Sequence, residues 1–296
     1  MLNLQRGKSM ALSVNTLTAG FLIAALGVGC GSGTPAAKDP MSPTMTARNW
    51  YRPSVQTQWQ WQLLGTVNTN YDVTVYDIDA QLDDASESSA DLISALQRQS
   101  RKVICYFSAG SSENWRADFN RFNESDMGKP LDGWEGERWL DVRSDNVRKI
   151  ILDRLDVARA KGCDGVEPDN VDGYANKTGF DLTKDDQLRF NRFLAVEAHR
   201  RGLSVGLKND GDQVKDLVDD FDFSVNEECH AYNECETLLP FVDAGKPVFN
   251  VEYSEDVEQA HEKAQSICSA ARDLDLRTLI LPLELDDSFR VSCDDL

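Results

Sequence analysis

The chain has 296 residues, and its 31 basic and 50 acidic side chains give a formal net charge of −19. Hydrophobic residues make up 41% of the chain and include six Trp and twelve Phe, which excludes a disordered acidic chain and allows one large core or two smaller domains. The acidity excludes a general nucleic-acid-binding protein, because phosphate binding needs clustered Lys and Arg. The negative charge either keeps the chain soluble or attracts a cationic substrate, and composition alone leaves both interpretations open.

Residues 1–29 have the features of a secretory signal peptide. Two basic residues lie ahead of a short apolar run, residues 17–28, which ends in small residues. This run is too short to cross the roughly 30 Å hydrocarbon core of a membrane as a helix. Cys30 stands where a bacterial lipoprotein signal carries its lipidated cysteine, although such signals usually have Leu at the position of Gly27. We therefore expect a secreted protein, or an extracytoplasmic lipoprotein attached to the membrane only through a lipid on Cys30.

Six cysteines follow Cys30, and an even number in an exported protein indicates disulfide bonds. Close spacing favours a bond between Cys229 and Cys235, and a bond between Cys268 and Cys293 could hold the C-terminus. Because six cysteines allow fifteen connectivities, the sequence leaves the pairing open. No metal site is expected, since the chain has no CxxC motif and its three His residues are scattered.

The predicted organisation is a flexible linker over residues 30–56, rich in Gly, Pro, Ser and Thr, followed by one domain over residues 57–296. Within that domain, short runs of branched and aromatic residues predict eight strands, at 59–64, 73–78, 102–107, 165–167, 204–207, 221–225, 247–251 and 278–283. Apolar residues at helical spacing predict four helices, at 89–99, 145–161, 183–201 and 257–272.

Alternation of strands and helices implies a parallel sheet with right-handed crossovers. The predicted fold class is therefore α/β, and the eight units fit a single (β/α)8 TIM barrel. The first connection is too short for a helix, and residues 108–143 form a long insertion. An open doubly wound sheet is the alternative, but no Gly-rich phosphate loop supports it.

Polar residues stand at the predicted C-terminal ends of nearly all strands, where (β/α)8 barrels carry their chemistry. For any single acid, helix capping or an ion pair with Lys208 is an equal alternative, but a whole ring at one rim indicates a functional surface. The acids at these ends are Asp77, Asp79, Glu167, Asp169, Asp172, Asp210, Glu227, Glu228, Glu252 and Glu284. Aromatic residues at the same rim could stack on sugar rings.

Two reaction classes use such a ring of carboxylates. Glycoside hydrolysis needs one carboxyl group to protonate the leaving oxygen and another to attack the anomeric carbon or activate water. Metal-assisted hydrolysis needs three or more acids around a divalent cation, and the absence of His at the strand ends counts against it without excluding Mg²⁺ or Ca²⁺. A nucleophilic triad is unsupported, because there is no GxSxG motif and no suitably placed His.

Seven short stretches carry a more specific resemblance. They are WQWQL from Trp59, YDID from Tyr76, CYFSAG from Cys105, WLDVR from Trp139, GCDGVEPDNVDGY from Gly162, GLKND from Gly206 and VNEEC from Val225. In this order, over about residues 59–284, they resemble the family 114 glycoside hydrolases of the endo-α-1,4-polygalactosaminidase type. The resemblance implies a (β/α)8 barrel that needs no cofactor and cleaves α-1,4-linked galactosamine polymers internally. The implied partner is a cationic amino-sugar polysaccharide, and we expect a monomer.

By this resemblance, Asp169 in the PDN stretch would be the catalytic nucleophile and Glu227 in the VNE stretch the general acid/base. The family usually carries Gln after that Glu, whereas Glu228 follows here. Neighbours in a strand point to opposite faces, so only one of the two glutamates can face the site, and alternation with Val225 favours Glu227. The resemblance favours retention of configuration, which the residues alone leave open.

The residues predicted to line the substrate site are Asp77, Asp79, Tyr106, Ser108, Glu167, Asp172, Lys208, Asn209, Glu228 and Tyr253. Asp77 and Asp79 could bind ammonium or hydroxyl groups of the substrate, and Lys208 could keep a carboxylate ionised. For Glu167 and Asp172, support of a neighbouring residue or helix capping is at least as consistent with their positions. Two rival hypotheses remain: a carbohydrate-binding lipoprotein without activity, and a metal-dependent hydrolase at the same rim.

Overall fold

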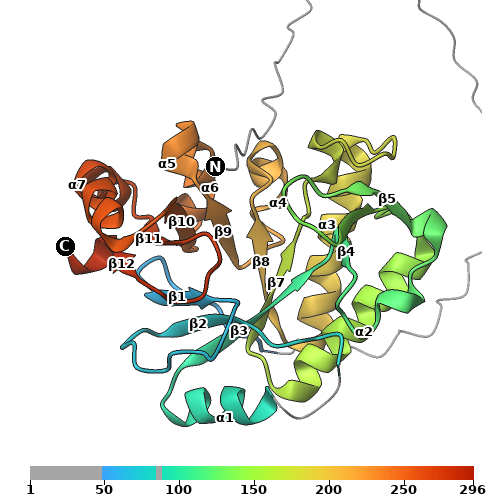
Figure 1. Ribbon diagram of the computed structural model, residues 1–296, viewed down its shortest axis with the longest axis horizontal. Helices are drawn as coiled ribbons and strands as arrows, with labels where there is room; N and C mark the ends of the chain where they lie inside the picture. Colours follow the sequence, from blue (N-terminus) through green and yellow to red (C-terminus); the bar gives the residue numbers. More distant parts are fainter. Residues whose placement is uncertain (1–48, 85–88) are drawn as a thin grey trace, which may run out of the picture. The chain divides into compact units, whose positions relative to one another are not determined.

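The computed structural model describes residues 49–84 and 89–296, which belong to one compact unit (Figure 1). The predicted signal peptide, Cys30 and most of the predicted linker lie outside the described residues. The last linker residues, 49–56, are described and contact the domain. Trp50 stacks on His199 with ring centroids 4.0 Å apart and donates a hydrogen bond to Asp222. No helix among the described residues is long and apolar enough to cross a membrane.

A nine-stranded sheet forms the centre of the unit (Figure 1). In spatial order its strands are β1 (Trp59–Gln62), β2 (Val75–Asp79), β3 (Lys102–Ser108), β7 (Gly165–Asp169), β8 (Ser204–Lys208), β9 (Phe223–Glu227), β10 (Val248–Ser254), β11 (Arg277–Pro282) and β12 (Val291–Ser292). The first eight pair in parallel, and β12 pairs antiparallel to β11. All eight predicted strands are confirmed, and β12 is an addition.

The long helices also confirm the prediction, with bounds that differ by one or two residues at most. They are α1 (Ala90–Arg98), α2 (Asp145–Lys161), α3 (Lys184–Arg201) and α7 (Val257–Asp273). Side chains of Ser144, Thr183 and Asp256 accept hydrogen bonds from the first-turn amides of α2, α3 and α7. Gly162 and Gly202, both with positive φ, end α2 and α3. Shorter helices, α4 (Val214–Leu217), α5 (Cys229–Tyr232) and α6 (Leu239–Asp243), follow β8 and β9.

The sheet is strongly curled, so that it has an inner and an outer apolar surface. The inner cluster combines Trp59 and Trp61 of β1 with Phe223 of β9 and Phe249 of β10, although these strands are far apart in the sheet. The outer cluster packs the other strand faces against α1, α2 and α3. Individual hydrogen bonds connect β1, at one end of the sheet, with β11, near the other end. For example, Trp59 Nε1 donates to the Arg277 carbonyl at 2.9 Å. The predicted parallel α/β architecture is therefore present as a curled sheet with helices outside it.

The insertion predicted after β3 folds into a small antiparallel sheet of its own. It contains β4 (Ser111–Glu113), β5 (Met127–Pro130) and β6 (Glu137–Leu140), in the order β4-β6-β5. This inserted sheet is joined closely to the end of β7, because a Cβ on Gly110 would lie only 1.7 Å from the Asn170 carbonyl oxygen. Strands of three or four residues give too little alternation to be predicted from sequence.

Three disulfide bonds hold the fold together. The predicted bonds Cys229–Cys235 and Cys268–Cys293 are confirmed, and the second fastens the C-terminal residues to α7. The third joins Cys105 in β3 to Cys163, which precedes β7, across 58 residues of sequence. It therefore ties together two neighbouring strands whose C-terminal ends carry predicted site residues.

Candidate active site

Lys208, the last residue of β8, is the centre of a cluster of charges at the strand ends. Its ammonium nitrogen lies 3.1 Å from Glu167 Oε1, 3.2 Å from Asp169 Oδ1 and 3.6 Å from Glu227 Oε2. Lys208 is only 2% exposed. Burial by itself would lower the pKa of Lys208, but the charges of Asp169, Glu227 and Glu167 raise it well above its usual value. The ammonium group therefore stays charged and draws carboxylates of β7 and β9 together.

Asp169, at the end of β7, accepts bonds on both carboxylate oxygens. Oδ1 faces Lys208 and accepts from the backbone N–H of Asn170 (2.7 Å), while Oδ2 accepts from the Tyr106 hydroxyl (3.2 Å). Burial and the negative charge of Asp169 raise the pKa of Tyr106, so this hydroxyl remains a donor. The backbone of Asp169 is fixed as well, because its carbonyl accepts from the N–H groups of Ala109 and Gly110. This arrangement stabilises an oriented anion.

Glu227, at the end of β9, is held by neutral donors in addition to Lys208. Its Oε1 accepts a 2.5 Å hydrogen bond from the Tyr253 hydroxyl, and its Oε2 accepts from Asn209 Nδ2 at 3.0 Å. The Asn209 side chain also accepts from the Glu227 backbone N–H, which locks the two residues together. Glu227 is thus the glutamate of the VNEEC stretch that contacts Lys208. Glu228 follows the strand with a φ of 61°, and its N–H donates to the Val251 carbonyl.

Left-handed backbone conformations occur directly after each of the three site strands. Asn170, Asn209, Asp210 and Glu228 have φ values of 51–61°. Asn and Asp tolerate this region because their short side chains bond locally, whereas Glu228 gains less from such bonding. Non-glycine residues in this conformation gather at functional sites, where the surrounding structure enforces them. The turns let each strand end on a site residue and leave the sheet at once.

Asp77 and Glu167 form a buried layer beneath Lys208, and both are fully buried. Burial, and after it the charge of Glu167, raises the pKa of Asp77 well above its usual value. Trp61 Nε1 donates to Glu167 Oε2 at 3.1 Å. Asp77 and Glu167, both predicted to line the substrate site, thus lie fully buried beside Lys208.

The remaining predicted residues lie at the edge of this cluster. Ser108 is fully buried, and its hydroxyl oxygen lies 2.6 Å from that of Ser111 in the inserted sheet. Asp79 is half-buried and pairs with Arg116 at 2.9 Å. Asp172 is half-buried in the loop after β7, and its negative charge helps to raise the pKa of the buried Asp210 to about 8, after burial as the main cause. Asp172 thus lies beside the site, near the end of β8.

Sequence reasoning missed the contribution of the inserted sheet. Glu113 and Glu137 are buried and directly opposite each other in β4 and β6. Trp115 and Trp134, 55% and 42% exposed, are surface aromatics of the same segment. Asn170 is a further residue that the sequence did not predict as part of the site. The signal that could have indicated it is an Asn directly after a strand-end Asp, which suits a left-handed turn. The short strands gave no periodic pattern that would have indicated this inserted sheet.

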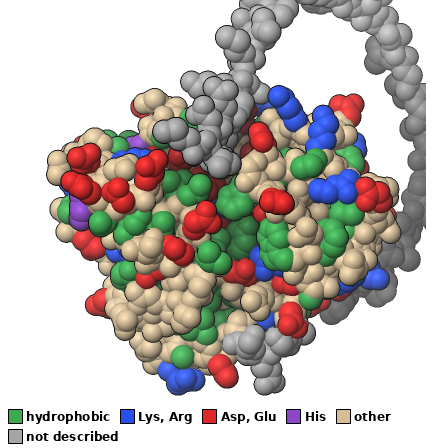
Figure 2. All heavy atoms as spheres, in the orientation of Figure 1, with side chains coloured by type: hydrophobic (Ala, Val, Ile, Leu, Met, Phe, Trp, Pro, Cys, Tyr) green, Lys and Arg blue, Asp and Glu red, His purple; other side chains and the backbone are tan. Residues whose placement is uncertain are grey.

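A groove of about 870 Å³ begins at Tyr253 and runs beside the ends of β10 and β11. Glu255, Glu262, Glu284 and Asp286 line it with a single basic residue, Lys263. Acidic side chains are spread over the displayed face, including around the hollow near the middle of the view (Figure 2). Since Tyr253 bonds Glu227, the acidic groove adjoins the charge cluster directly.

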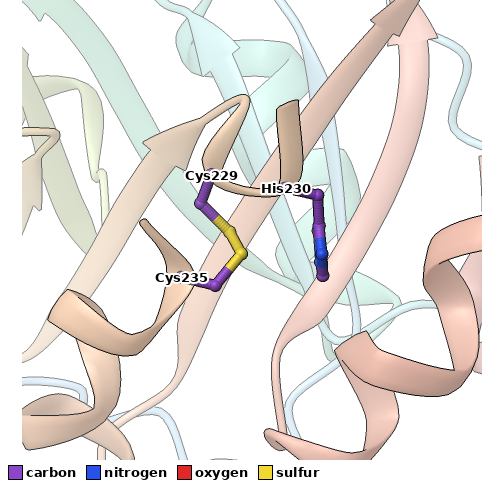
Figure 3. A group of neighbouring side chains, drawn as sticks. All are labelled: Cys229, His230 and Cys235. Carbon is purple, nitrogen blue, oxygen red and sulfur yellow. A yellow bond between two sulfur atoms is a disulfide. The ribbon is translucent and has the colours of Figure 1, made fainter. Parts of the chain in front are cut away.

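Within residues 49–84 and 89–296, the group of side chains arranged most like metal ligands is Cys229, His230 and Cys235. Figure 3 shows that Cys229 and Cys235 are joined in a disulfide, with His230 beside it. Bonded sulfurs offer no thiolates, so these residues do not make a zinc site. At the strand ends, the ammonium of Lys208 occupies the position among three carboxylates that a cation would take.

Two carboxylates on alternate strands of a curled parallel sheet, joined by one buried lysine, suit the two-carboxylate chemistry of glycoside hydrolysis. The sequence pattern of glycoside hydrolase family 114 matches residues 41–296, and the chain belongs to this family. A search among functionally curated proteins gives no match.

Solved structures agree with this assignment. Aspergillus fumigatus Ega3, solved in complex with galactosamine, has 45% sequence identity to this chain. Its structure matches with a TM-score of 0.76, covering 85% of this chain and 100% of the Ega3 chain. The glycoside hydrolase domain of PelA from Pseudomonas aeruginosa is 14% identical, with a TM-score of 0.63 over 79% of this chain and 98% of that domain, and shares the fold. The predicted family and the prediction of an enzyme are confirmed.

Proposed function

We propose that the protein is an exported endo-acting hydrolase of α-1,4-linked, galactosamine-containing polysaccharide. The observation that carries this proposal is the Asp169–Lys208–Glu227 cluster, in a chain 45% identical to an enzyme solved with galactosamine. Three disulfide bonds support export, because such bonds persist in oxidising compartments. The contacts between the two ends of the curled sheet support its closure as a (β/α)8 barrel.

The proposed reaction proceeds in two displacements. An Asp169 oxygen attacks the anomeric carbon while Glu227 donates its proton to the leaving glycosidic oxygen, which breaks the C–O bond and leaves a glycosyl ester on Asp169. Glu227, now ionised, takes a proton from water, and the resulting hydroxide displaces Asp169 from the anomeric carbon. Each step inverts the anomeric carbon, so the product retains the starting configuration.

The surrounding residues suit these two roles. Lys208 and Tyr106 contact and aim the Asp169 carboxylate, as a nucleophile requires. Tyr253 and Asn209 hold Glu227 in place through neutral groups, which allow it to gain and lose a proton. The acidic groove beside Tyr253 would attract a polymer that carries a positive charge on each deacetylated unit.

Hydrolysis assays with purified galactosamine-rich polysaccharide test this proposal. The wild-type protein should release new reducing ends, with faster cleavage of deacetylated than of fully acetylated polymer and weaker activity at high salt. Asp169→Asn and Glu227→Gln should each abolish release, and EDTA should leave it unchanged. Wild-type-like release by either variant would disprove the assignment of residues. Tight binding without any release would favour the rival carbohydrate-binding protein, and loss of activity in EDTA would favour the metal-dependent one.

The anomeric configuration of the first product separates the two-displacement reaction from a single displacement by water. NMR spectra recorded in the first minutes of hydrolysis should show the α-anomer, before mutarotation mixes the two forms. An initial β-anomer would instead make Asp169 a general base.

A further inference from the structure

A continuous line of hydrogen bonds runs from the inserted sheet to Asp169. The Ser111 hydroxyl donates to Glu137 Oε2 at 2.6 Å, and the hydroxyl oxygens of Ser108 and Ser111 are 2.6 Å apart. Asn170 Nδ2 donates to Ser108 Oγ at 2.9 Å, and the Asn170 backbone N–H donates to Asp169 Oδ1 at 2.7 Å. The line therefore connects β6, β4, the end of β3 and the end of β7.

The direction of each bond in this line follows from the number of protons available. The single Ser111 hydroxyl proton is donated to Glu137 Oε2. Ser111 Oγ must then accept from Ser108, whose one proton is used in that bond. Ser108 Oγ can therefore only accept from Asn170, which requires the NH₂ group of the Asn170 amide at this position. The carboxylate of Glu137 sets the polarity of the whole line.

Glu137 lies in the right place for this task. It is 6% exposed, and Ser111 and Glu137 meet on the face of the inserted sheet that is turned toward the ends of β3 and β7. Burial raises the pKa of Glu137 to about 7, the Ser111 bond opposes this shift, and the charges of Glu113 and Asp169 add to it. Glu137 is therefore close enough to sense the charge of Asp169.

Asn170 needs this support because its backbone is left-handed, with a φ of 61°. That conformation aims its N–H at Asp169 Oδ1, and its energetic cost is offset by the side-chain bonds to Ser108 and Ser111. Released from those bonds, the peptide could rotate and withdraw a donor from the carboxylate. A misplacement of about 1 Å at a reacting group can cost roughly 100-fold in rate.

We propose that Glu137 is a positioning residue for the reaction: through Ser111, Ser108 and Asn170 it fixes the carboxylate of Asp169. This inference rests on the proposed function, in which Asp169 attacks the substrate. It assigns a role in the reaction to the inserted sheet, which the charge cluster around Lys208 does not include.

Steady-state kinetics on galactosamine-rich polysaccharide test the proposal. Ser111→Ala and Glu137→Ala should each lower kcat by about 10- to 100-fold while KM stays within about twofold, since neither residue touches substrate. The double variant should be no slower than the slower single variant, because both interrupt the same line. Glu137→Gln retains an acceptor oxygen for Ser111 and should recover most of the wild-type kcat.

Glu124→Ala is the matched control, because this glutamate lies on the same insertion, is 78% exposed at its side chain and pairs with Arg138 away from the line. Its kcat should equal that of the wild type. Thermal unfolding shows which variants are folded, and Ser111→Ala provides the milder change if Glu137→Ala fails to fold.

An unchanged kcat in Ser111→Ala, or a rise in KM alone in Glu137→Ala, would overturn the positioning role. If Asp169→Asn is inactive while the Glu137 and Ser111 variants behave as wild type, only this inference fails. If Asp169→Asn is itself active, the proposed function fails first.

Discussion

The ends of β7 and β9 each present one carboxylate to Lys208, but the two carboxylates are held by different groups. Asp169 on β7 receives an ammonium group at 3.2 Å and a backbone N–H at 2.7 Å, and the inserted sheet lies behind it. Glu227 on β9 lies farther from Lys208, at 3.6 Å, and receives side-chain donors from Tyr253 and Asn209. The β7 end is thus built for a fixed anion, and the β9 end for a group held by its neutral neighbours.

In the proposed reaction, this difference would give two similar groups two different roles. A nucleophile benefits from permanent charge and rigid aim, whereas an acid/base must change its charge once in each step. The two environments, more than the choice of Asp or Glu, therefore make the roles unequal. Variants at the two ends should fail in different ways.

The largest expected effect comes from removing the two carboxylates themselves. Asp169→Gly and Glu227→Ala should each lose roughly 100- to 10,000-fold in kcat. With an aryl glycoside, whose leaving group departs without a proton, azide should restore both variants, because it fits the vacated space. The glycosyl azide should have inverted configuration with Asp169→Gly and retained configuration with Glu227→Ala. Product NMR distinguishes the two. The opposite pattern would exchange the roles of the β7 and β9 ends.

Loss of the shared cation should damage both ends together. Lys208→Met keeps the length of the side chain but leaves the carboxylates of Glu167, Asp169 and Glu227 without their common partner. Removing one member of a buried ionic cluster typically costs about 3–5 kcal/mol of stability, and we expect kcat to fall about 100-fold. Urea unfolding and kinetics measure the two effects. A stable, fully active variant would show that Lys208 does not organise the site.

The two tyrosines allow a matched comparison at smaller scale. Tyr253→Phe removes the 2.5 Å bond to Glu227, and Tyr106→Phe removes the 3.2 Å bond to Asp169. We expect kcat to fall about 10-fold for Tyr253→Phe and less for Tyr106→Phe, because Lys208 and the Asn170 N–H still hold Asp169. Equal losses would mean that the β7 end is no better secured than the β9 end.

The smallest expected effect concerns Asp210, in the turn after β8 between the two ends. Burial, with the charge of Asp172, raises its pKa from 3.8 to about 8. The folded protein therefore holds a proton that the unfolded chain releases, and this contribution to stability is lost as pH rises from about 4 to about 8. Asp210→Asn should flatten the fall in Tm between pH 5 and pH 8 by a few degrees. A pH dependence identical to the wild type would place that titration elsewhere.

The sequence predicted the eight parallel strands and four long helices because their periodicity and caps are local properties. Gly162 and Gly202, for example, end their helices where the pattern stops. Asp169 and Glu227 belong to the predicted ring of strand-end acids for the same reason, since the C-terminal end of a strand is a position in the chain as much as in space, and the family resemblance then singled out this pair. Alternation along β9 also selected Glu227 over Glu228.

Other parts of the site depend on contacts that no local pattern contains. Glu137 reaches Asp169 through residues of three other segments, and the disulfide between Cys105 and Cys163 spans 58 residues. The burial of Asp77 follows from the curl of the sheet, which its own strand does not reveal. Sequence alone gives each of these residues several equally good positions, and only tertiary packing chooses among them.

The contact between Gly110 and Asn170 also has an evolutionary consequence. Loops at the rim of parallel barrels are usually exchangeable, because the sheet beneath them carries the stability. Here a Cβ at residue 110 would collide with the Asn170 backbone, and the side chain of Asn170, in its left-handed turn, donates to Ser108 and to Ser111 of the insertion. A homologous insertion grafted onto this scaffold should therefore succeed only when both segments are transferred together, and drift in one should be matched by compensating change in the other.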